Sequence, residues 1–309
     1  MKKIAVSIGD LNGIGFEIAL AAHESVKKVA CPLYCVSRGM AERAASLLGK
    51  KLPGDFECVG EGAVFEIRPG EVDAVAGRAS FESFVQAVDW TVKRETDAVV
   101  TLPINKAAWM AVGLKYKGHT DYLKERFGEG AIMMLGRPGL YVALFTDHLP
   151  LSRVCETVRE LPLTEFLLRF ATLCGEGPIG VLALNPHAGD QGAIGTEDAV
   201  IDRAIRTVNA ALKRPLLEGP LVPDTAFTPK MRERYGYYVA MYHDQGLGPL
   251  KALAFDESIN VTLGLPIVRT SVDHGTAFDI AYRGRSPSVK SYLNAVQVAV
   301  KGLWHNRSV

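Results

Sequence analysis

Residues 3–23 read KIAVSIGDLNGIGFEIALAAH, and this stretch decides the fold class because an apolar strand leads through a glycine-rich turn into an apolar helix. The pattern predicts a strand over Lys3–Ser7 and a helix over Gly15–His23. A further buried strand is expected at Ala98–Thr101, after a long amphipathic helix. Strands that alternate with helices indicate parallel strands joined by helical crossovers, so the chain is expected to be α/β.

The second half of the chain continues the same pattern with one difference. Ile132–Leu135 and Tyr141–Phe145 are apolar and are separated by a turn that contains Arg-Pro-Gly, which predicts a hairpin. Further strands and helices follow, and Thr164 is expected to cap one of these helices.

A chain of 309 residues exceeds the size at which one hydrophobic core stops growing, so two domains are expected. No internal repeat or long linker marks a boundary between them. A discontinuous first domain fits that absence, with the last helix returning to the first half. The expected division is residues 1–115 with 285–309 for one α/β domain, and residues 116–284 for the other.

The bulk composition narrows the class of protein. Hydrophobic residues make up 48%, charged residues 22%, and the net charge is +1, which argues against a nucleic-acid surface or a polybasic membrane patch. No apolar run approaches the length of a membrane span, and Gly9 and Asp10 interrupt the only candidate signal segment. The five cysteines are scattered, so we expect reduced structural thiols and a cytoplasmic protein. They are Cys31, Cys35, Cys58, Cys155 and Cys174.

Polar residues gather at the ends of predicted strands, where open α/β sheets place their ligand sites. Gly9–Gly15 is either a tight turn or a site where a helix N-terminus receives an anion. At Gly118–Asp121, Thr120 or Asp121 either caps a helix, or His119 binds a carboxylate or phosphate beside free helix N–H groups.

Three histidines each follow a hydrophobic strand closely, at His148, His187 and His243. One such histidine is usually a structural hydrogen-bonding residue. Three in the same context also fit a catalytic metal centre, because neutral imidazole is a common ligand of Zn²⁺ and similar ions. Their spacing matches no local metal motif, so both interpretations stay open.

Two cations farther along the chain allow two interpretations. Lys251 and Arg269 either hold a phosphate, Arg269 through a bidentate fork, or are solvated surface charges. Asn260 lies between them in the sequence.

Residues 273–281 read DHGTAFDIA and resemble the loop that binds the adenine and ribose of the nicotinamide cofactor in isocitrate and isopropylmalate dehydrogenases. The other interpretation is a helix-opening turn capped by Thr276. Together with further segments, this loop makes the chain similar to the 4-hydroxythreonine-4-phosphate dehydrogenase family of pyridoxal 5′-phosphate biosynthesis. Those segments are Gly118-His119-Thr120, residues 184–189 (LNPHAG), 195–197 (GTE), 242–247 (YHDQGL), 260–266 (NVTLGLP) and 269–271 (RTS).

The resemblance implies roles for individual residues. The metal ligands would be His148, His187 and His243. The substrate contacts would be His119, Thr120, Lys251, Asn260 and Arg269. The cofactor contacts would be Asp273, His274, Gly275, Thr276 and Asp279. The catalytic base is not identified, and Lys251 and Asp244 are the candidates.

The resemblance also implies a fold and a reaction. The fold would be a two-domain α/β/α arrangement like that of isocitrate and isopropylmalate dehydrogenases, in a homodimer whose active site lies between domains and takes residues from both subunits. With NAD or NADP and a divalent ion (Zn, Mg or Co), the enzyme would oxidise 4-phosphooxy-L-threonine to 2-amino-3-oxo-4-phosphooxybutanoate. That product would then lose CO₂ to give 3-amino-2-oxopropyl phosphate.

Three alternatives remain at this point. The first is a related dehydrogenase of threonate or erythronate 4-phosphate, which would share every motif. The others are a metal-dependent phosphatase or hydrolase, which the 273–281 loop argues against, and a non-catalytic binding protein. The chain departs from the family at Leu11 and Phe16, where the family usually has prolines.

Overall fold

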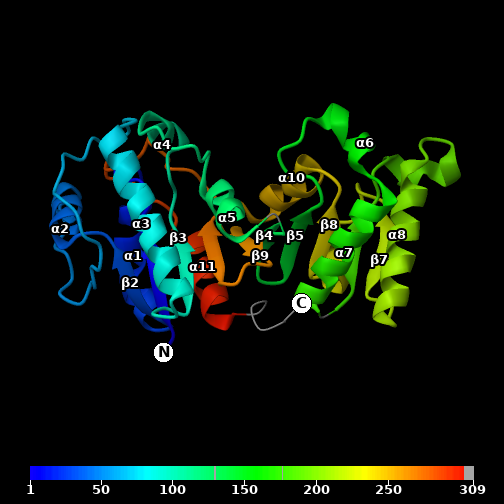
Figure 1. Cartoon of the computed structure of the whole chain (residues 1–309), viewed down its shortest axis with the longest axis horizontal. Helices are drawn as coiled ribbons and strands as arrows, with labels where there is room; N and C mark the ends of the chain where they lie inside the picture. Colours follow the sequence, from blue (N-terminus) through cyan, green and yellow to red (C-terminus); the bar gives the residue numbers. More distant parts are fainter. Residues whose placement is uncertain (129, 176, 303–309) are drawn as a thin grey trace. The chain divides into compact units, whose positions relative to one another are not determined.

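The computed structural model describes residues 1–128, 130–175 and 177–302. By contacts, the chain divides into two compact units. The first unit comprises Met1–Ala131 and Ile259–His305, with its described part ending at residue 302, and the second comprises Ile132–Ser258. Both contain a sheet with helices, which confirms the predicted α/β class (Figure 1).

The described part of the first unit has five strands in the order β2-β1-β3-β10-β9, all parallel except β9, which runs antiparallel to β10. Helix α3 packs along β1 and helix α11 along β10 (Figure 1). The strands are β1 (Lys3–Ser7), β2 (Cys31–Cys35), β3 (Ala98–Thr101), β9 (Ile259–Leu263) and β10 (Arg269–Val272). The helices are α1 (Gly15–Lys27), α2 (Arg38–Leu47), α3 (Ala74–Val92), α4 (Lys106–Ala111), α5 (His119–Phe127) and α11 (Lys290–Lys301).

Among its described residues, the second unit has five strands in the order β4-β5-β8-β6-β7, and the predicted hairpin is its antiparallel pair β4–β5. The strands are β4 (Ile132–Arg137), β5 (Leu140–Leu144), β6 (Ile179–Leu182), β7 (Leu217–Leu221) and β8 (Tyr237–Ala240). The helices are α6 (Val154–Thr157), α7 (Glu160–Cys174), α8 (Glu197–Leu212), α9 (Pro229–Arg234) and α10 (His243–Ala254), with short 3₁₀ segments η1 (Leu151–Arg153) and η2 (Pro186–Gly192).

The predicted cap at Thr164 is wrong. Helix α7 begins at Glu160 and Thr164 lies inside it. The helix buries Leu163, Leu167 and Phe170 along one face, and that packing extends the helix beyond the polar residue that suggested its start.

The compact units also differ from the expected division at residues 115/116 and 284/285. Strand β10 pairs with β3, and β9 pairs with β10, so residues 259–272 complete the sheet of the first unit. The sequence between residues 116 and 131, which includes α5, also belongs to the first unit.

No helix among the described residues combines the length and apolar character that a membrane span needs. None of the five cysteines, all of which lie in the described part of the chain, forms a disulfide, which agrees with the reduced thiols that the scattered spacing predicted. Burial raises the pKa of the Cys35 thiol to about 12, so this thiol stays protonated at neutral pH.

Candidate functional site

Arg269 begins β10 and is almost completely buried, at 3% exposure. Its Nη1 donates to Thr262 Oγ1 at 3.0 Å and its Nη2 donates to Thr101 Oγ1 at 2.9 Å, while Nε has no hydrogen-bond partner in the described part of the chain. Burial lowers the pKa of this guanidinium to about 10, so it remains charged at neutral pH. Among the described residues, no carboxylate pairs with it. A buried cation without a counter-charge is costly, which indicates a place for an anion.

His119 is the first residue of α5, and its imidazole contacts the guanidinium of Arg269. Arg269 Nη2 lies 3.2 Å from His119 Nδ1, and His119 Nε2 is buried with no hydrogen-bond partner among the residues described. Burial first, and then the charges of Arg269 and Lys106, hold the pKa of His119 well below its usual value of 6.5. At neutral pH this imidazole is therefore uncharged.

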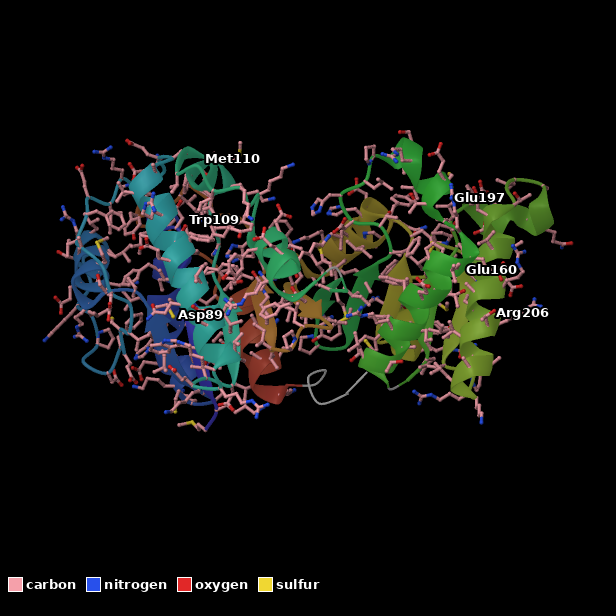
Figure 2. All side chains as sticks on the ribbon, in the orientation of Figure 1. Asp89, Trp109, Met110, Glu160, Glu197 and Arg206 are labelled. Carbon is pink, nitrogen blue, oxygen red and sulfur yellow. The ribbon has the colours of Figure 1, made fainter. Side chains whose placement is uncertain are left out.

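Aromatic rings fix the orientation of His119. Its ring lies 4.3 Å from that of Phe84 and 5.6 Å from that of Trp109, centroid to centroid. Trp109 Nε1 in turn donates to Ser80 Oγ at 2.8 Å. Figure 2 shows Trp109 on α4 beside Met110, whose side chain is 65% exposed. The buried side of α4 therefore packs against the His119 ring through Trp109.

The remaining proposed substrate contacts lie in different places. Asn260 is on β9, two residues before Thr262 and so on the same face of the sheet. Its Oδ1 is buried and accepts no hydrogen bond from the residues that the structure describes. Thr120 follows His119 on α5 and is partly buried. Lys251 belongs to the second unit, on α10, where its Nζ lies 3.4 Å from Ser258 Oγ. The structure thus joins His119 to Arg269 by contact, with Asn260 on the adjacent strand.

In the second unit, His148 follows β5 and His243 opens α10 just after β8. Strands β5 and β8 are parallel neighbours, so residues after their carboxyl ends come together, and the two imidazole rings lie 5.8 Å apart. His243 Nδ1 lies 2.7 Å from Asp244 Oδ1, and His148 Nδ1 lies 3.8 Å from Asp147 Oδ2. Carboxylates beside Nδ1 are the usual partners of histidines that bind metal through Nε2.

His187 lies in an unusual backbone segment. From His187 to Gln191, five consecutive residues have left-handed φ/ψ angles, four of them not glycine. Such a conformation is strained and persists only where neighbouring contacts impose it. Here Ile194 N donates to Gly189 O and Ala193 N donates to Asp190 O, each at 3.1 Å. Just before the segment, the buried carboxylate of Asp198 accepts the backbone N–H of Leu184 at 2.7 Å and a hydrogen bond from the side chain of Asn185 at 2.8 Å.

The three histidines are not all brought together within one chain. Over the parts of the chain that the structure describes, their ligand nitrogens do not all lie within 4.8 Å of one another. His148 and His243 are neighbours, and the position of His187 in a common metal site stays a prediction.

The Asp273–Asp279 loop packs on the Gly9–Gly15 turn within the first unit. Ile14 N donates to Thr276 O at 3.0 Å, and a side chain on Gly13 would clash with Thr276. Gly9 and Leu11 of the turn also line a cavity of about 410 Å³ at the carboxyl ends of β1 and β2. Gly13 N also donates to Asp10 O at 3.0 Å, so two N–H groups of this segment are already bonded within the protein, which favours the tight-turn interpretation of residues 9–15.

Asp10 in this turn is fully buried. The effect of its ionisation on the free energy of unfolding can be tested. Desolvation raises its pKa from 3.8 to about 6, assisted by Asp73, although Oδ1 accepts the backbone N–H of Asn12. The raised value means that ionisation opposes folding: the folded state is favoured while Asp10 is protonated, and stability falls as pH rises from about 4 through 6. We expect Asp10→Asn to raise the free energy of unfolding by about 2 kcal/mol at pH 7.5 and by less than about 1 kcal/mol at pH 4.

Urea unfolding of wild type and Asp10→Asn at both pH values measures this difference. Glu95→Gln, at an exposed position of the same unit, is the control and should show no such pH-dependent gain. An Asp10→Asn protein less stable than wild type at pH 7.5 would contradict the argument.

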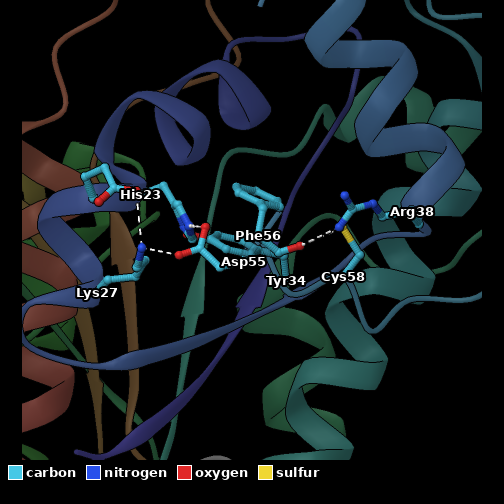
Figure 3. Close-up of polar contacts among 8 residues, drawn as sticks. His23, Lys27, Tyr34, Arg38, Asp55, Phe56 and Cys58 are labelled. Atoms are coloured by element: carbon cyan, nitrogen blue, oxygen red, sulfur yellow. Dashed lines mark hydrogen bonds and ion pairs between the residues drawn. The ribbon is translucent and has the colours of Figure 1, made fainter. Parts of the chain in front are cut away.

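A second cluster of potential metal ligands was not anticipated from the sequence (Figure 3). His23, Glu24 and Asp55 place ligand atoms within 4.8 Å of one another. However, the ammonium of Lys27 binds both Asp55 and Glu24, and therefore already supplies the positive charge. His23 also reaches Tyr34 Oη at 2.9 Å, so the cluster fastens the Asp55 segment to α1 and β2.

The chain is similar to known proteins over nearly its full length. Residues 23–299 match the family model described as pyridoxal phosphate biosynthetic protein PdxA. A protein of Sulfurimonas denitrificans named 4-hydroxythreonine-4-phosphate dehydrogenase is 51% identical over 96% of this chain and 97% of its own length. The crystal structure of a 4-hydroxythreonine-4-phosphate dehydrogenase from Burkholderia phymatum is 33% identical, with a TM-score of 0.80 over 97% of this chain and 98% of that one. A terephthalate 1,2-cis-dihydrodiol dehydrogenase from Burkholderia xenovorans is 25% identical, with a TM-score of 0.67 over 97% and 98%.

Proposed function

The chain belongs to the PdxA family of pyridoxal phosphate biosynthetic proteins, and from that premise we propose that it is an NAD-dependent 4-hydroxythreonine-4-phosphate dehydrogenase. It would oxidise 4-phosphooxy-L-threonine to 2-amino-3-oxo-4-phosphooxybutanoate, which decarboxylates to 3-amino-2-oxopropyl phosphate. The single observation that carries this proposal is the buried guanidinium of Arg269, which has no counter-ion among the described residues. A phosphorylated hydroxy acid supplies the missing negative charge.

Arg269 and His119 would form the centre of the substrate site. Arg269 provides charge, and the neutral imidazole of His119 provides a hydrogen bond without adding a second cation. Asn260, Thr120 and Lys251 complete the proposed set, with the buried Oδ1 of Asn260 able to accept a hydrogen bond from the ligand.

His148, His187 and His243 are the proposed ligands of one divalent ion, Zn, Mg or Co. The geometry of His148 and His243 suits this role, because their rings are neighbours and each Nδ1 faces a carboxylate. Such an ion, when bound, lowers the pKa of a substrate hydroxyl. Asp244 contacts His243 and so orients it, which favours Lys251 over Asp244 as the proton acceptor.

We assign the cofactor, NAD or NADP, to Asp273, His274, Gly275, Thr276 and Asp279. The contact of this loop with the Gly9–Gly15 turn, and the cavity lined by that turn, support the assignment. Nicotinamide-linked chemistry and five free thiols are typical of cytoplasmic enzymes, and we propose that location.

We further propose a homodimer in which the second copy supplies His187 to the site formed by His148 and His243. The support is the neighbouring position of His148 and His243, together with the absence of a three-histidine group among the described residues. After subunit exchange, His187→Ala mixed with His148→Ala should regain up to half of the wild-type activity per mixed dimer. One site in that dimer carries both lesions, and the other carries neither.

The matched control is His148→Ala mixed with His243→Ala, which should stay inactive because each site keeps one lesion. Mass spectrometry verifies the exchange. Recovery in the control pair, or a protein that sediments as a monomer, would contradict this arrangement.

The activity itself is tested by following the absorbance of the reduced cofactor with 4-hydroxythreonine 4-phosphate, NAD and a divalent metal. The Burkholderia xenovorans relative is named for a different diol, so threonate and erythronate 4-phosphate are measured beside it. We expect the highest kcat/KM with 4-hydroxythreonine 4-phosphate. A higher value with either competitor would reassign the substrate, and phosphate release without NAD would indicate a phosphatase.

A further inference from the structure

We propose that Arg269 fixes the tautomer of His119, so that the imidazole presents Nε2–H as a hydrogen-bond donor to a substrate oxygen, and that Thr101 is the positioning residue that holds Arg269 in this role. The substrate part of this inference rests on the proposed function, whereas the tautomer itself does not.

The tautomer follows from what a guanidinium can offer. Arginine carries five N–H donors and no acceptor, and its Nη2 lies 3.2 Å from His119 Nδ1. A hydrogen on Nδ1 would face another hydrogen there, so Nδ1 must carry the lone pair that accepts from Nη2. In a neutral imidazole the proton then resides on Nε2.

The Nε2–H donor has no hydrogen-bond acceptor within the described part of the chain. This atom is buried and makes no hydrogen bond to protein. The rings of Phe84 and Trp109 flank the imidazole and oppose its rotation toward another partner. A buried N–H without an acceptor is unfavourable, so a ligand oxygen is its natural partner.

Thr101 and Thr262 determine where the guanidinium lies. Thr101 is fully buried at the end of β3, and its Oγ1 accepts from Nη2, while Thr262 on β9 accepts from Nη1. Both acceptors are neutral hydroxyls, so they orient Arg269 without cancelling its charge. A carboxylate in either place would form an ion pair and weaken the attraction for an anionic ligand.

The tautomer can be observed without substrate. Two-dimensional ¹H–¹⁵N NMR of the full-length protein labelled with ¹⁵N-histidine should show His119 with a protonated Nε2 and an unprotonated Nδ1 at pH 7. His119→Ala assigns the signal. A proton on Nδ1 would overturn the inference even if the protein proves to be the proposed dehydrogenase.

Thr101→Val removes the hydroxyl with little change in volume and tests the positioning role. We expect the His119 ¹⁵N signals to shift toward a mixture of tautomers, and the KM for substrate to rise about tenfold while the KM for NAD is unchanged. Thr101→Ser should restore both readouts. Unchanged His119 signals in a folded Thr101→Val protein would remove Thr101 from this role.

A pair of His119 variants tests the direction of the hydrogen bond. The amide nitrogen of His119→Gln can take the place of Nε2, whereas that of His119→Asn lies nearer Nδ1. We expect His119→Gln to keep the substrate KM within about tenfold of wild type, and His119→Asn to raise it about a hundredfold. The reverse order would overturn the assigned donor. If no substrate is turned over, the same ranking is measured as the affinity of each protein for inorganic phosphate.

Discussion

Replacing His187 by alanine is expected to abolish turnover and to weaken divalent-metal binding by at least about a hundredfold. Loss of a residue that merely orients a metal ligand typically lowers affinity by 10- to 100-fold, so loss of a ligand should cost at least as much. His187 stands in a left-handed backbone segment in which the Gly189 carbonyl accepts the backbone N–H of Ile194 and the Asp190 carbonyl accepts that of Ala193. A strained backbone that is held in place in this way is common at functional sites.

Elemental analysis of the purified protein and the NAD-reduction assay measure the two effects together. Gln191→Ala is the matched control, because it alters an exposed side chain of the same left-handed segment and should leave metal content unchanged. If His187→Ala retains both bound metal and turnover, the metal assignment is wrong.

Arg269→Lys is expected to raise the KM for substrate by about a hundredfold while leaving the KM for NAD near the wild-type value. The lysine ammonium keeps the positive charge, but that charge is concentrated on one nitrogen, and the lysine side chain differs in length from that of arginine. It cannot reproduce the planar fork that contacts Thr101, Thr262 and His119 at once. Arg269→Gln, which also removes the charge, should be more harmful still.

Steady-state kinetics with each substrate varied in turn distinguish these effects. Arg43→Lys makes the same chemical change at an exposed position of the first unit and should leave all kinetic constants unchanged. A raised KM for NAD with an unchanged KM for substrate would count decisively against the proposed role of Arg269.

Local sequence patterns were sufficient for the α/β class and for several elements. Lys3–Ser7 and Ala98–Thr101 are strands with the predicted bounds, and the antiparallel hairpin is also confirmed. These elements could be predicted from the sequence because apolar runs and turns are properties of short segments. Thr164 was misread because burial of the leucines on α7 outweighed a local capping preference.

For the candidate site, the sequence identified some of the residues, and only the structure identified the partners that hold them in place. His119, Asn260 and Arg269 were named from residue type and from resemblance, but nothing in the sequence pointed to Thr101 or Thr262. Thr101 and His119 are separated from Arg269 by 168 and 150 residues. The register of β3, β10 and β9 brings Thr101 and Thr262 to Arg269, and the packing of α5 brings His119 to it. The sequence by itself determined which residues could carry the chemistry. Tertiary structure decided that the guanidinium is buried with no counter-ion among the residues that the structure describes, and that the imidazole beside it is neutral. The reason is that desolvation and hydrogen bonding depend on which distant segments pack together.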